Sequence, residues 1–377
     1  MTSKLRNTLE DLIRRAVAEG VTPSAVCAVA SGGERLEPIA VGDAVRFGEN
    51  GQELPEAERV RAEAGTSYDL ASVTKIFTTI TALSLVDDGT LKLDQPIGSQ
   101  LPQYRIGAKS QVTLRHLLTH TSGLPGSWTG WLRALERAEG FERERLLKDL
   151  LATELEAAPG SRFEYSCVGF NTVMALAETA TGRPWAKLVQ ERLLDRLPTT
   201  ELTGAPEIER CAATEFQPEL GRGMVRGIVH DEAAWSLGSG QAGGLSGNGL
   251  CGNAGMFGTA AALLELGEAL RTALPGILSP GLAAEMWRSQ LPEGLAEKSG
   301  IDFGHSLGLR IGQSSWVGDH SEARGHNGFT GTSLLVDQQA GISVVLLSNR
   351  VHPRRELSDV QAFRRSISDA VYQELAV

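Results

Sequence analysis

Residues 66–89 read TSYDLASVTKIFTTITALSLVDDG, a β-prone start followed by an apolar run. In that run, apolar side chains recur at helical spacing up to a stop at Gly89, namely at Ile76, Phe77, Ile80 and Leu83. We therefore expect a strand, a tight turn and a buried helix. Ser72 and Lys75 then lie in the first turn of this helix.

The start of this helix combines a hydroxyl with an amine. Ser72 and Lys75 are three residues apart and therefore share a helix face. The Ser72 amide is among the unpaired donors of the helix start, where negative charge is favoured. Because burial lowers the pKa of an amine, a desolvated Lys75 is expected to act as a base toward Ser72. The alternative is a chance Ser-Xaa-Xaa-Lys sequence with a solvated lysine, and the apolar neighbours Ile76 and Phe77 favour the catalytic interpretation.

Before this segment, the sequence predicts a helix and a hairpin. Residues 1–20 place leucine, isoleucine and valine along one helical stripe, so they form an amphipathic helix of the fold and not a signal peptide. Residues 23–31 (PSAVCAVAS) and 35–42 (RLEPIAVG) are β-prone, and Gly32-Gly33 forms the turn between them.

The C-terminal part of the chain returns to β-structure. Short apolar or alternating segments occur at residues 306–312 (SLGLRIG), 331–337 (GTSLLVD) and 342–349 (ISVVLLSN). The stretch from about residue 358 to 375 is expected to close the fold as a helix.

These patterns predict an α+β (mixed α/β) fold with two parts. Residues 1–89 and 301–377 are expected to form a domain around one antiparallel sheet, assembled from both chain ends and flanked by helices. Residues 90–300 contain helical pieces joined by loops with glycine and proline, which predicts a mostly helical second domain that carries the active-site loops.

Composition narrows the class of protein. The 377 residues are 41% apolar and 22% charged, which excludes disordered, collagen-like and coiled-coil proteins. The net charge is −10 and there is no run of basic residues, so nucleic acid is not expected as a partner. No apolar run is long enough to span a bilayer, and we expect a cytoplasmic protein without a membrane partner. The four cysteines have no close spacing and are expected to be reduced, namely Cys27, Cys167, Cys211 and Cys251.

Two further motifs accompany Ser72 and Lys75 in sequence order. The first is Phe163-Glu164-Tyr165-Ser166 and the second is Gly325–Gly331, which reads GHNGFTG and enters a strand. With the longer segments around them, they resemble the serine β-lactamase and penicillin-binding protein superfamily, nearest to class C β-lactamases and family VIII carboxylesterases. The resemblance covers nearly the whole chain through seven segments: YDLASVTK, LRHLLTHTSGLP, APGSRFEYS, VHDEAAW, GNAGMFGTA, GHNGFTGTSLLVD and SNRVHP.

The resemblance implies the catalytic residues. Ser72 is the nucleophile, Lys75 its base partner and Tyr165 the second group that transfers protons. The amides of Ser72 and Phe329 are expected to form the oxyanion hole. Gly328 is expected to let the substrate approach the strand closely.

The substrate-binding residues depart from the family pattern at two positions. Cys167 stands where the family commonly has asparagine, which disfavours amide-bearing β-lactams. His326 stands where β-lactamases have lysine, so a permanent charge for a substrate carboxylate is replaced by a group mostly neutral at pH 7. We nevertheless assign His326, Asn327, Gly328 and Cys167 to substrate binding, together with Asn253 in the glycine-rich segment.

Several other patterns are judged accidental. Ser306 lies in a lipase-like G-x-S-x-G sequence, yet strand and helix are not in the required order. His116 and His120 have zinc-helix spacing but lack the accompanying glutamate, so they are interpreted as core or loop histidines. Residues 237–255 contain G-x-G-x-x-G twice without a preceding strand, and we expect a flexible loop beside the active site. Three tryptophans are candidates for an acyl pocket: Trp128, Trp131 and Trp235.

The sequence therefore predicts a serine hydrolase that needs neither cofactor nor metal and forms an acyl-enzyme at Ser72. The preferred activity is that of a carboxylesterase on short-chain esters, with weak β-lactam hydrolysis possible. A muropeptide amidase or a D-amino-acid-specific peptidase would use the same residues. A non-catalytic penicillin-binding-like sensor is the alternative of another class. For each of the enzyme hypotheses, the expected partner is a small-molecule ester or amide substrate. No motif indicates the oligomeric state.

Overall fold

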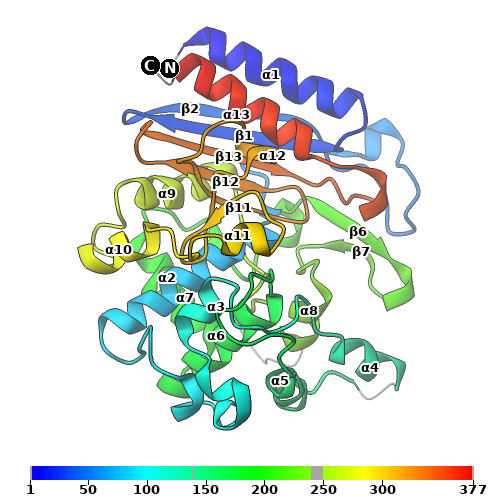
Figure 1. Ribbon diagram of the computed structural model, residues 1–377. Coiled ribbons are helices and arrows are strands. Elements are labelled where there is room, and N and C mark those ends of the chain that lie inside the picture. The colour runs from blue at the N-terminus through cyan, green and yellow to red at the C-terminus, as the bar shows by residue number, and fades with distance from the viewer. Residues whose placement is uncertain (1, 138–139, 239–248, 376–377) are drawn as a thin grey trace.

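The computed structural model describes residues 2–137, 140–238 and 249–375. Its centre is an antiparallel sheet of eight strands in the order β3-β2-β1-β13-β12-β11-β10-β9 (Figure 1). The strands come from both chain ends, as expected: β1 (Ser24–Ser31), β2 (Glu34–Val45), β3 (Val60–Arg61), β9 (Gly304–His305), β10 (Arg310–Ile311), β11 (Arg324–Asn327), β12 (Ser333–Asp337) and β13 (Ile342–Ser348). The first and last of the long strands are neighbours, with Ala25 opposite Ser348.

One face of the sheet is covered by helices from the two ends of the chain. They are α1 (Ser3–Ala18), the short α12 (Ser314–Val317) and α13 (Gln361–Leu375). Leu9, Ile13 and Phe363 are buried here against the sheet residues Val29 and Leu346. The α1 helix begins where Thr2 Oγ1 accepts a hydrogen bond from the Leu5 amide at 3.2 Å. Both termini lie at the same end of this layer, where Lys4 pairs with Glu374 at 2.5 Å (Figure 1).

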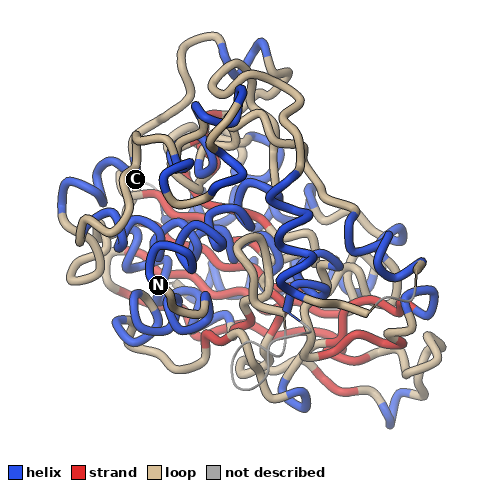
Figure 2. The backbone as a smooth tube through the Cα atoms, turned by 90° about the horizontal axis from the view of Figure 1, so that it is seen from below, coloured by secondary structure: helices blue, strands red, loops and turns tan. Residues whose placement is uncertain are grey.

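The opposite face of the sheet packs against the helical region (Figure 2). The central helix α2 (Thr74–Asp87) contacts α6 and α7, and α9 (Ala260–Arg271) lies against β1, β12 and β13. The remaining helices are α3 (Leu114–Leu118), α4 (Gly130–Glu136), α5 (Arg143–Ala152), α6 (Cys167–Thr181), α7 (Trp185–Arg192), α8 (Glu232–Gly238), α10 (Pro280–Trp287) and α11 (Leu295–Lys298). One apolar core joins the sheet to the helical region. The domain boundaries expected after residues 89 and 300 stay predictions.

The short strand expected just before the Ser72 turn is present as β4, and it pairs in a small sheet with two strands that the sequence did not reveal. β4 (Tyr68–Asp69), β8 (Phe257–Gly258) and β5 (Leu202–Thr203) form a three-stranded sheet in that order. A separate hairpin consists of β6 (Ala213–Gln217) and β7 (Gly223–Arg226). Across the described part of the chain, every helix is too short or too polar to cross a membrane.

Candidate active site

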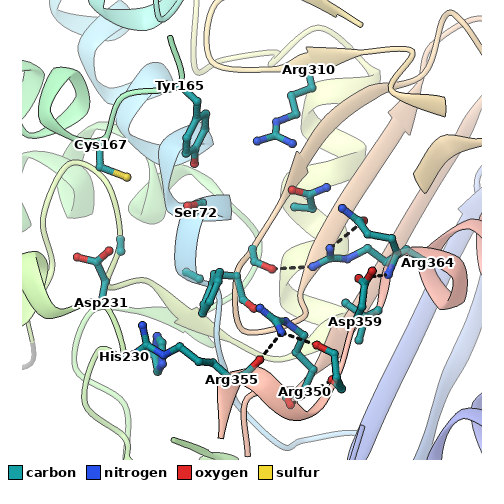
Figure 3. A pocket seen from close by; sticks show the side chains of 18 of the residues that line it. Ser72, Tyr165, Cys167, His230, Asp231, Arg310, Arg350, Arg355, Asp359 and Arg364 are labelled. Carbon is teal, nitrogen blue, oxygen red and sulfur yellow. Dashed lines mark hydrogen bonds between the residues drawn. The ribbon is translucent and has the colours of Figure 1, made fainter. Parts of the chain in front are cut away.

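A strained turn holds Ser72 at the start of α2. The chain passes from β4 through a single 3₁₀ turn, Ala71–Val73, and Ala71 adopts a φ of +46°, which residues with a side chain rarely do. Asp69 stabilises the turn, because its two carboxylate oxygens accept the amides of Ala71 and His230, each at 2.7 Å. Burial raises the pKa of Asp69, and these amide hydrogen bonds oppose the shift. The half-buried Ser72 is thereby presented to a cavity of about 630 Å³ (Figure 3).

Lys75 lies directly beneath the nucleophile and has no exposed surface. Its Nζ donates to Ser72 Oγ and to the Asn253 carbonyl, both at 3.1 Å, and lies 3.6 Å from Cys167 Sγ. Burial disfavours the ammonium, but interactions with Cys167 and Tyr165 outweigh it and raise the pKa of Lys75. The expectation of a lysine with a lowered pKa is therefore wrong, because it counted burial and omitted these two neighbours.

Tyr165 projects into the cavity from the residue before the N-cap of α6. Ser166 Oγ caps that helix by accepting the Gly169 amide at 3.0 Å. Two cations lie near the phenol ring. Lys75 Nζ lies 4.9 Å from the ring centroid. The Arg310 guanidinium carbon lies 5.1 Å from it (Figure 3). The proton-transfer groups assigned from the sequence, Ser72, Lys75 and Tyr165, are therefore brought together around one point.

His120 supports Tyr165 from behind. Its ring lies 4.6 Å from the Tyr165 ring, and its Nδ1 accepts the Ser166 amide at 2.9 Å. Burial lowers the pKa of His120 well below its usual value, which keeps the imidazole neutral and able to accept this hydrogen bond. His116 instead caps α3, where its ring accepts the Thr113 amide.

The candidate oxyanion hole lies between the Ser72 turn and the loop from β11 to β12. Thr330 Oγ1 donates to the Asp69 carbonyl at 2.7 Å and Thr332 Oγ1 donates to the Leu70 carbonyl at 3.0 Å, so side chains hold the two segments together. Within the described residues, neither the Ser72 nor the Phe329 amide donates to a backbone or side-chain acceptor. Both residues line the cavity, so two unpaired N–H groups are available for a developing oxyanion.

Gly328 is needed for this packing. A Cβ at this position would lie 2.2 Å from Thr332 Oγ1 and 2.7 Å from the Leu70 carbonyl. The close approach is therefore between the loop and the Ser72 turn, where the sequence analysis expected close approach of a substrate.

The residues predicted to bind substrate divide into two groups. Cys167, Asn327 and Gly328 line the cavity. Asn253 and His326 are 1% and 0% exposed. Asn253 contributes its carbonyl to Lys75, as described above, while its side-chain amide has no hydrogen-bond partner among the described residues.

His326 does not reach the cavity, contrary to the direct substrate contact expected from the sequence. Successive residues of a strand point to opposite faces, and Asn327 is the one in the cavity wall. The His326 Nδ1–H donates to the Asn327 carbonyl at 2.8 Å, and the ring lies 5.9 Å from that of Tyr165. Burial, together with Arg310 and Lys75, lowers the pKa of His326 well below its usual value, so the ring is neutral.

Sequence reasoning missed most of the charged residues around the cavity. The lining also includes His230, Asp231, Arg310, Arg350, Arg355 and Arg364 (Figure 3). His230, Asp231 and Arg350 occur in segments of the resemblance, VHDEAAW and SNRVHP, which was the available signal. Arg310 and Arg364 belong to β10 and α13 and lie in none of these motifs.

Ser306 and the three tryptophans proposed for an acyl pocket do not belong to the cavity lining, whereas Ala254 of the glycine-rich segment does. Ser306 is fully buried in the connection between β9 and β10, where its amide donates to the Leu309 carbonyl at 2.8 Å. Trp128 donates to Asp149 at 2.8 Å, and neither it nor Trp131 nor Trp235 lines the cavity. Most of the predicted flexible glycine-rich loop, residues 239–248, lies outside the described residues.

Comparisons with known proteins agree with this arrangement. A family model described as Beta-lactamase matches residues 9–367. Esterase EstB of Burkholderia gladioli is 32% identical over 93% of this chain and 92% of its own length. N-acetylmuramyl-L-alanine amidase of Bacillus subtilis (strain 168) is 27% identical over 93% of this chain and 82% of its own. Among solved structures, EstCE1, a hydrolase with promiscuous acyltransferase activity, covers 98% of both chains with a TM-score of 0.73 and 24% identity, and shares the fold.

Proposed function

Because the chain belongs to the β-lactamase family of serine hydrolases, we propose that it is a carboxylesterase that forms an acyl-enzyme at Ser72 and cleaves short-chain esters. One observation carries the proposal. Ser72 Oγ lies 3.1 Å from Lys75 Nζ in a cavity that Tyr165 and Phe329 also line. Nucleophile, proton-transfer groups and oxyanion donors therefore meet at a single point, which acyl transfer requires.

Acylation begins when Ser72 Oγ attacks the ester carbonyl. Because Lys75 donates a hydrogen bond to Ser72 and also interacts with the Tyr165 hydroxyl, the serine proton passes into the Lys75–Tyr165 pair. The new oxyanion accepts hydrogen bonds from the Ser72 and Phe329 amides. The bond to the alcohol then breaks, and the alkoxide leaves with a proton from the same pair.

Deacylation repeats these steps with water as the nucleophile. Water gives a proton to the Lys75–Tyr165 pair while its oxygen attacks the acyl carbon. The bond to Ser72 Oγ breaks, the serine recovers the proton and the carboxylic acid leaves. The raised pKa of Lys75 favours its charged form. Lys75 therefore serves the Lys75–Tyr165 pair better by holding positive charge between the proton transfers than by acting as a neutral base.

Cys167 supports esters over amide-bearing β-lactams as substrates. It lines the cavity beside Ser72, at the position where the family commonly has asparagine. A thiol is a weak hydrogen-bonding group compared with a carboxamide, so an amide side chain of a substrate gains little there. The relative EstB, whose name describes an esterase, supports the same preference. Weak β-lactam hydrolysis is compatible with this site.

A specific observation favours a second candidate, a muropeptide amidase or D-amino-acid-specific peptidase. Within the described residues, Arg310, Arg350 and Arg364 line the cavity without forming an ion pair with any carboxylate. Guanidinium groups bind carboxylates well, and peptides end in one. A sensor without turnover is less favoured, since both amides and all three proton-transfer residues are in place.

The test combines covalent labelling with turnover. We expect a fluorophosphonate to label wild-type protein on the peptide that contains Ser72, and the protein to cleave p-nitrophenyl butyrate. Both signals should disappear in Ser72→Ala and persist in Ser306→Ala, which serves as the matched serine control. Loss in Ser306→Ala alone would overturn the assignment of the nucleophile.

Two further outcomes separate the candidates. Cleavage of N-acetylmuramyl peptides without cleavage of p-nitrophenyl butyrate would replace the esterase with the amidase. Stable labelling of Ser72 with no turnover of either substrate would favour the sensor.

A further inference from the structure

Arg364 is a buried cation that the acyl-transfer steps described above do not use. It lies in α13 and points toward the cavity, yet only 5% of its surface is exposed (Figure 3). In the described part of the chain it has no carboxylate partner, although its neighbour Arg365 pairs with Asp369 and Asp319. Burial, with Arg350 and Arg310 nearby, lowers the pKa of Arg364 to about 9, so it remains charged at neutral pH. Burying a charge without an opposite charge beside it costs free energy of folding, so we looked for what this guanidinium does in the site.

Backbone carbonyls of the oxyanion loop solvate this charge. Arg364 Nη2 donates to the Gly328 carbonyl at 2.6 Å and to the Thr332 carbonyl at 3.0 Å. The Gly328 carbonyl also accepts the Gly331 amide at 3.1 Å. The guanidinium therefore links the loop between β11 and β12 to α13.

The peptide group that Arg364 contacts is the one that supplies the oxyanion donor. The Gly328 C=O and the Phe329 N–H belong to a single planar unit, and in a trans peptide they point in opposite directions. A guanidinium fixed on the carbonyl side therefore sets the direction of the N–H on the cavity side. A charged donor on the carbonyl also polarises the peptide, which strengthens the N–H as a hydrogen-bond donor.

We infer that Arg364 is a positioning residue that aligns and polarises the Gly328–Phe329 peptide, so that its N–H stabilises the oxyanion of the transition state. This inference rests on the acyl-enzyme chemistry proposed above and adds a residue to it. Arg350 holds the next peptide, since its Nε donates to the Phe329 carbonyl at 2.7 Å. Among the arginine side chains of the described residues, Arg364 is the one that donates to the Gly328 carbonyl, which shares a peptide plane with the Phe329 N–H.

The experiment compares Arg364→Met with Arg364→Lys, and uses Arg365→Met on the same helix as the matched control. Removing one oxyanion donor typically costs about 100- to 1,000-fold in kcat, so misaligning one should cost roughly 10- to 100-fold. We expect Arg364→Met to lose this much kcat on p-nitrophenyl butyrate with KM changed less than about threefold. Arg364→Lys, which keeps a charged donor, should recover part of the loss, and Arg365→Met should match wild type.

A thionoester identifies the affected step. Sulfur accepts hydrogen bonds weakly, so the corresponding thionobutyrate depends less on the oxyanion hole than the ester does. We expect the ester-to-thionoester ratio of kcat to fall in Arg364→Met and to stay at the wild-type value in Arg365→Met. A loss confined to KM would overturn the inference, because Arg364 would then bind substrate. Equal losses on ester and thionoester would also overturn it, because they would indicate a general structural defect.

The rate at which a fluorophosphonate labels Ser72 separates this inference from the esterase proposal. Phosphonylation also develops charge on an oxygen in the oxyanion hole, and it needs no knowledge of the natural substrate. If wild-type protein is labelled at Ser72 but cleaves no ester, the esterase proposal fails. A slower labelling rate in folded Arg364→Met would then still support the role of Arg364, and an unchanged rate would refute it.

Discussion

His326 shows how one position along a strand decides what a side chain can do. Its sequence context predicted contact with a substrate, but the ring is fully buried, lies 5.9 Å from that of Tyr165 and does not belong to the cavity lining. A positive charge on this side of the cavity comes from Arg310 of β10, whose guanidinium carbon lies 5.1 Å from the centroid of the Tyr165 ring. Burial and the nearby charges of Arg310 and Lys75 lower the pKa of His326, so its ring adds no further charge here.

This position predicts the outcome of His326→Lys. A lysine here would bury a third positive charge beside those of Arg310 and Lys75, so we expect the free energy of unfolding to fall by roughly 2–5 kcal/mol. Denaturant titration measures this loss, and His326→Gln, which stays neutral, is the control. We expect no rise in the ratio of nitrocefin to p-nitrophenyl butyrate turnover. A stable variant with a raised ratio would show that residue 326 does reach the substrate.

His352 predicts how stability depends on pH. Its Nε2 accepts the amides of Arg46 and Phe47, each at 3.0 Å, and its Nδ1–H donates to the Thr214 carbonyl at 2.9 Å. Burial lowers the pKa of His352 to about 4, below the value near 6.5 of an unfolded chain. The neutral ring therefore contributes its full stabilisation above pH 6.5 and loses it as the pH falls from 6.5 toward 4.

The measurement is the free energy of unfolding of wild type and His352→Gln between pH 7.5 and pH 4. Wild type should lose stability over this window, and the variant should lose it less steeply, by at most about 1.4 kcal/mol per pH unit. At pH 7.5 both curves should be flat, which is the internal control. Parallel slopes in the two proteins would contradict the role of His352.

At the scale of elements, the site depends on how the loop from β11 to β12 rests on the turn before α2. Thr330 and Thr332 tie these two segments together, and Gly328 allows their backbones to meet. The nucleophile comes with one segment and one oxyanion donor with the other. Their relative position therefore sets the geometry of the oxyanion hole.

Gly328→Ala should disturb this contact. The added methyl must displace Thr332 or the Leu70 carbonyl, and misplacement of a catalytic group by about 1 Å can cost roughly 100-fold. We expect kcat on p-nitrophenyl butyrate to fall at least about tenfold. Gly281→Ala is the control, because a Cβ there meets no atom within 4 Å and alanine favours the α10 helix. Unchanged kcat in Gly328→Ala would show that the loop tolerates the shift.

The sequence predicted the large elements well and the charged site poorly, for physical reasons. Periodicity revealed α1, α2, the hairpin of β1 and β2, and β12 with β13, because each is long and buries one face or all of itself. Strands of two residues, such as β5 and β8, carry no periodic signal. The raised pKa of Lys75 and the position of Arg364 depend on neighbours distant in sequence, and no local pattern records such contacts.

At the scale of the molecule, the sheet separates two apolar layers with different tasks. The layer under α1 and α13 holds the chain ends together, and the layer on the other face contains the Ser72 helix. Leu9 belongs to the first layer and is fully buried. The sheet lies between it and the nucleophile.

Leu9→Ala should therefore affect stability without affecting catalysis. We expect the free energy of unfolding to fall by about 2–5 kcal/mol through the cavity left in the core. The kcat of the folded fraction, measured at low temperature, should equal that of wild type. Ile106→Ala, at a side chain that is 80% exposed, should change stability by less than about 0.5 kcal/mol. A large loss of kcat in Leu9→Ala would show that the layers are coupled.

The pairing of β1 with β13 has a consequence for how the protein is made. The Ser24 amide donates to Asn349 Oδ1, which lies 325 residues later in the chain. At roughly 5–20 residues per second, a ribosome needs about a quarter of a minute to a minute to deliver that partner. During this time β1 has no partner on the edge that β13 later occupies. Its backbone N–H and C=O groups there are unpaired, and such an edge promotes aggregation of nascent chains. Synthesis that stops before β13 therefore yields a polypeptide in which β1 lacks its partner at the centre of the sheet.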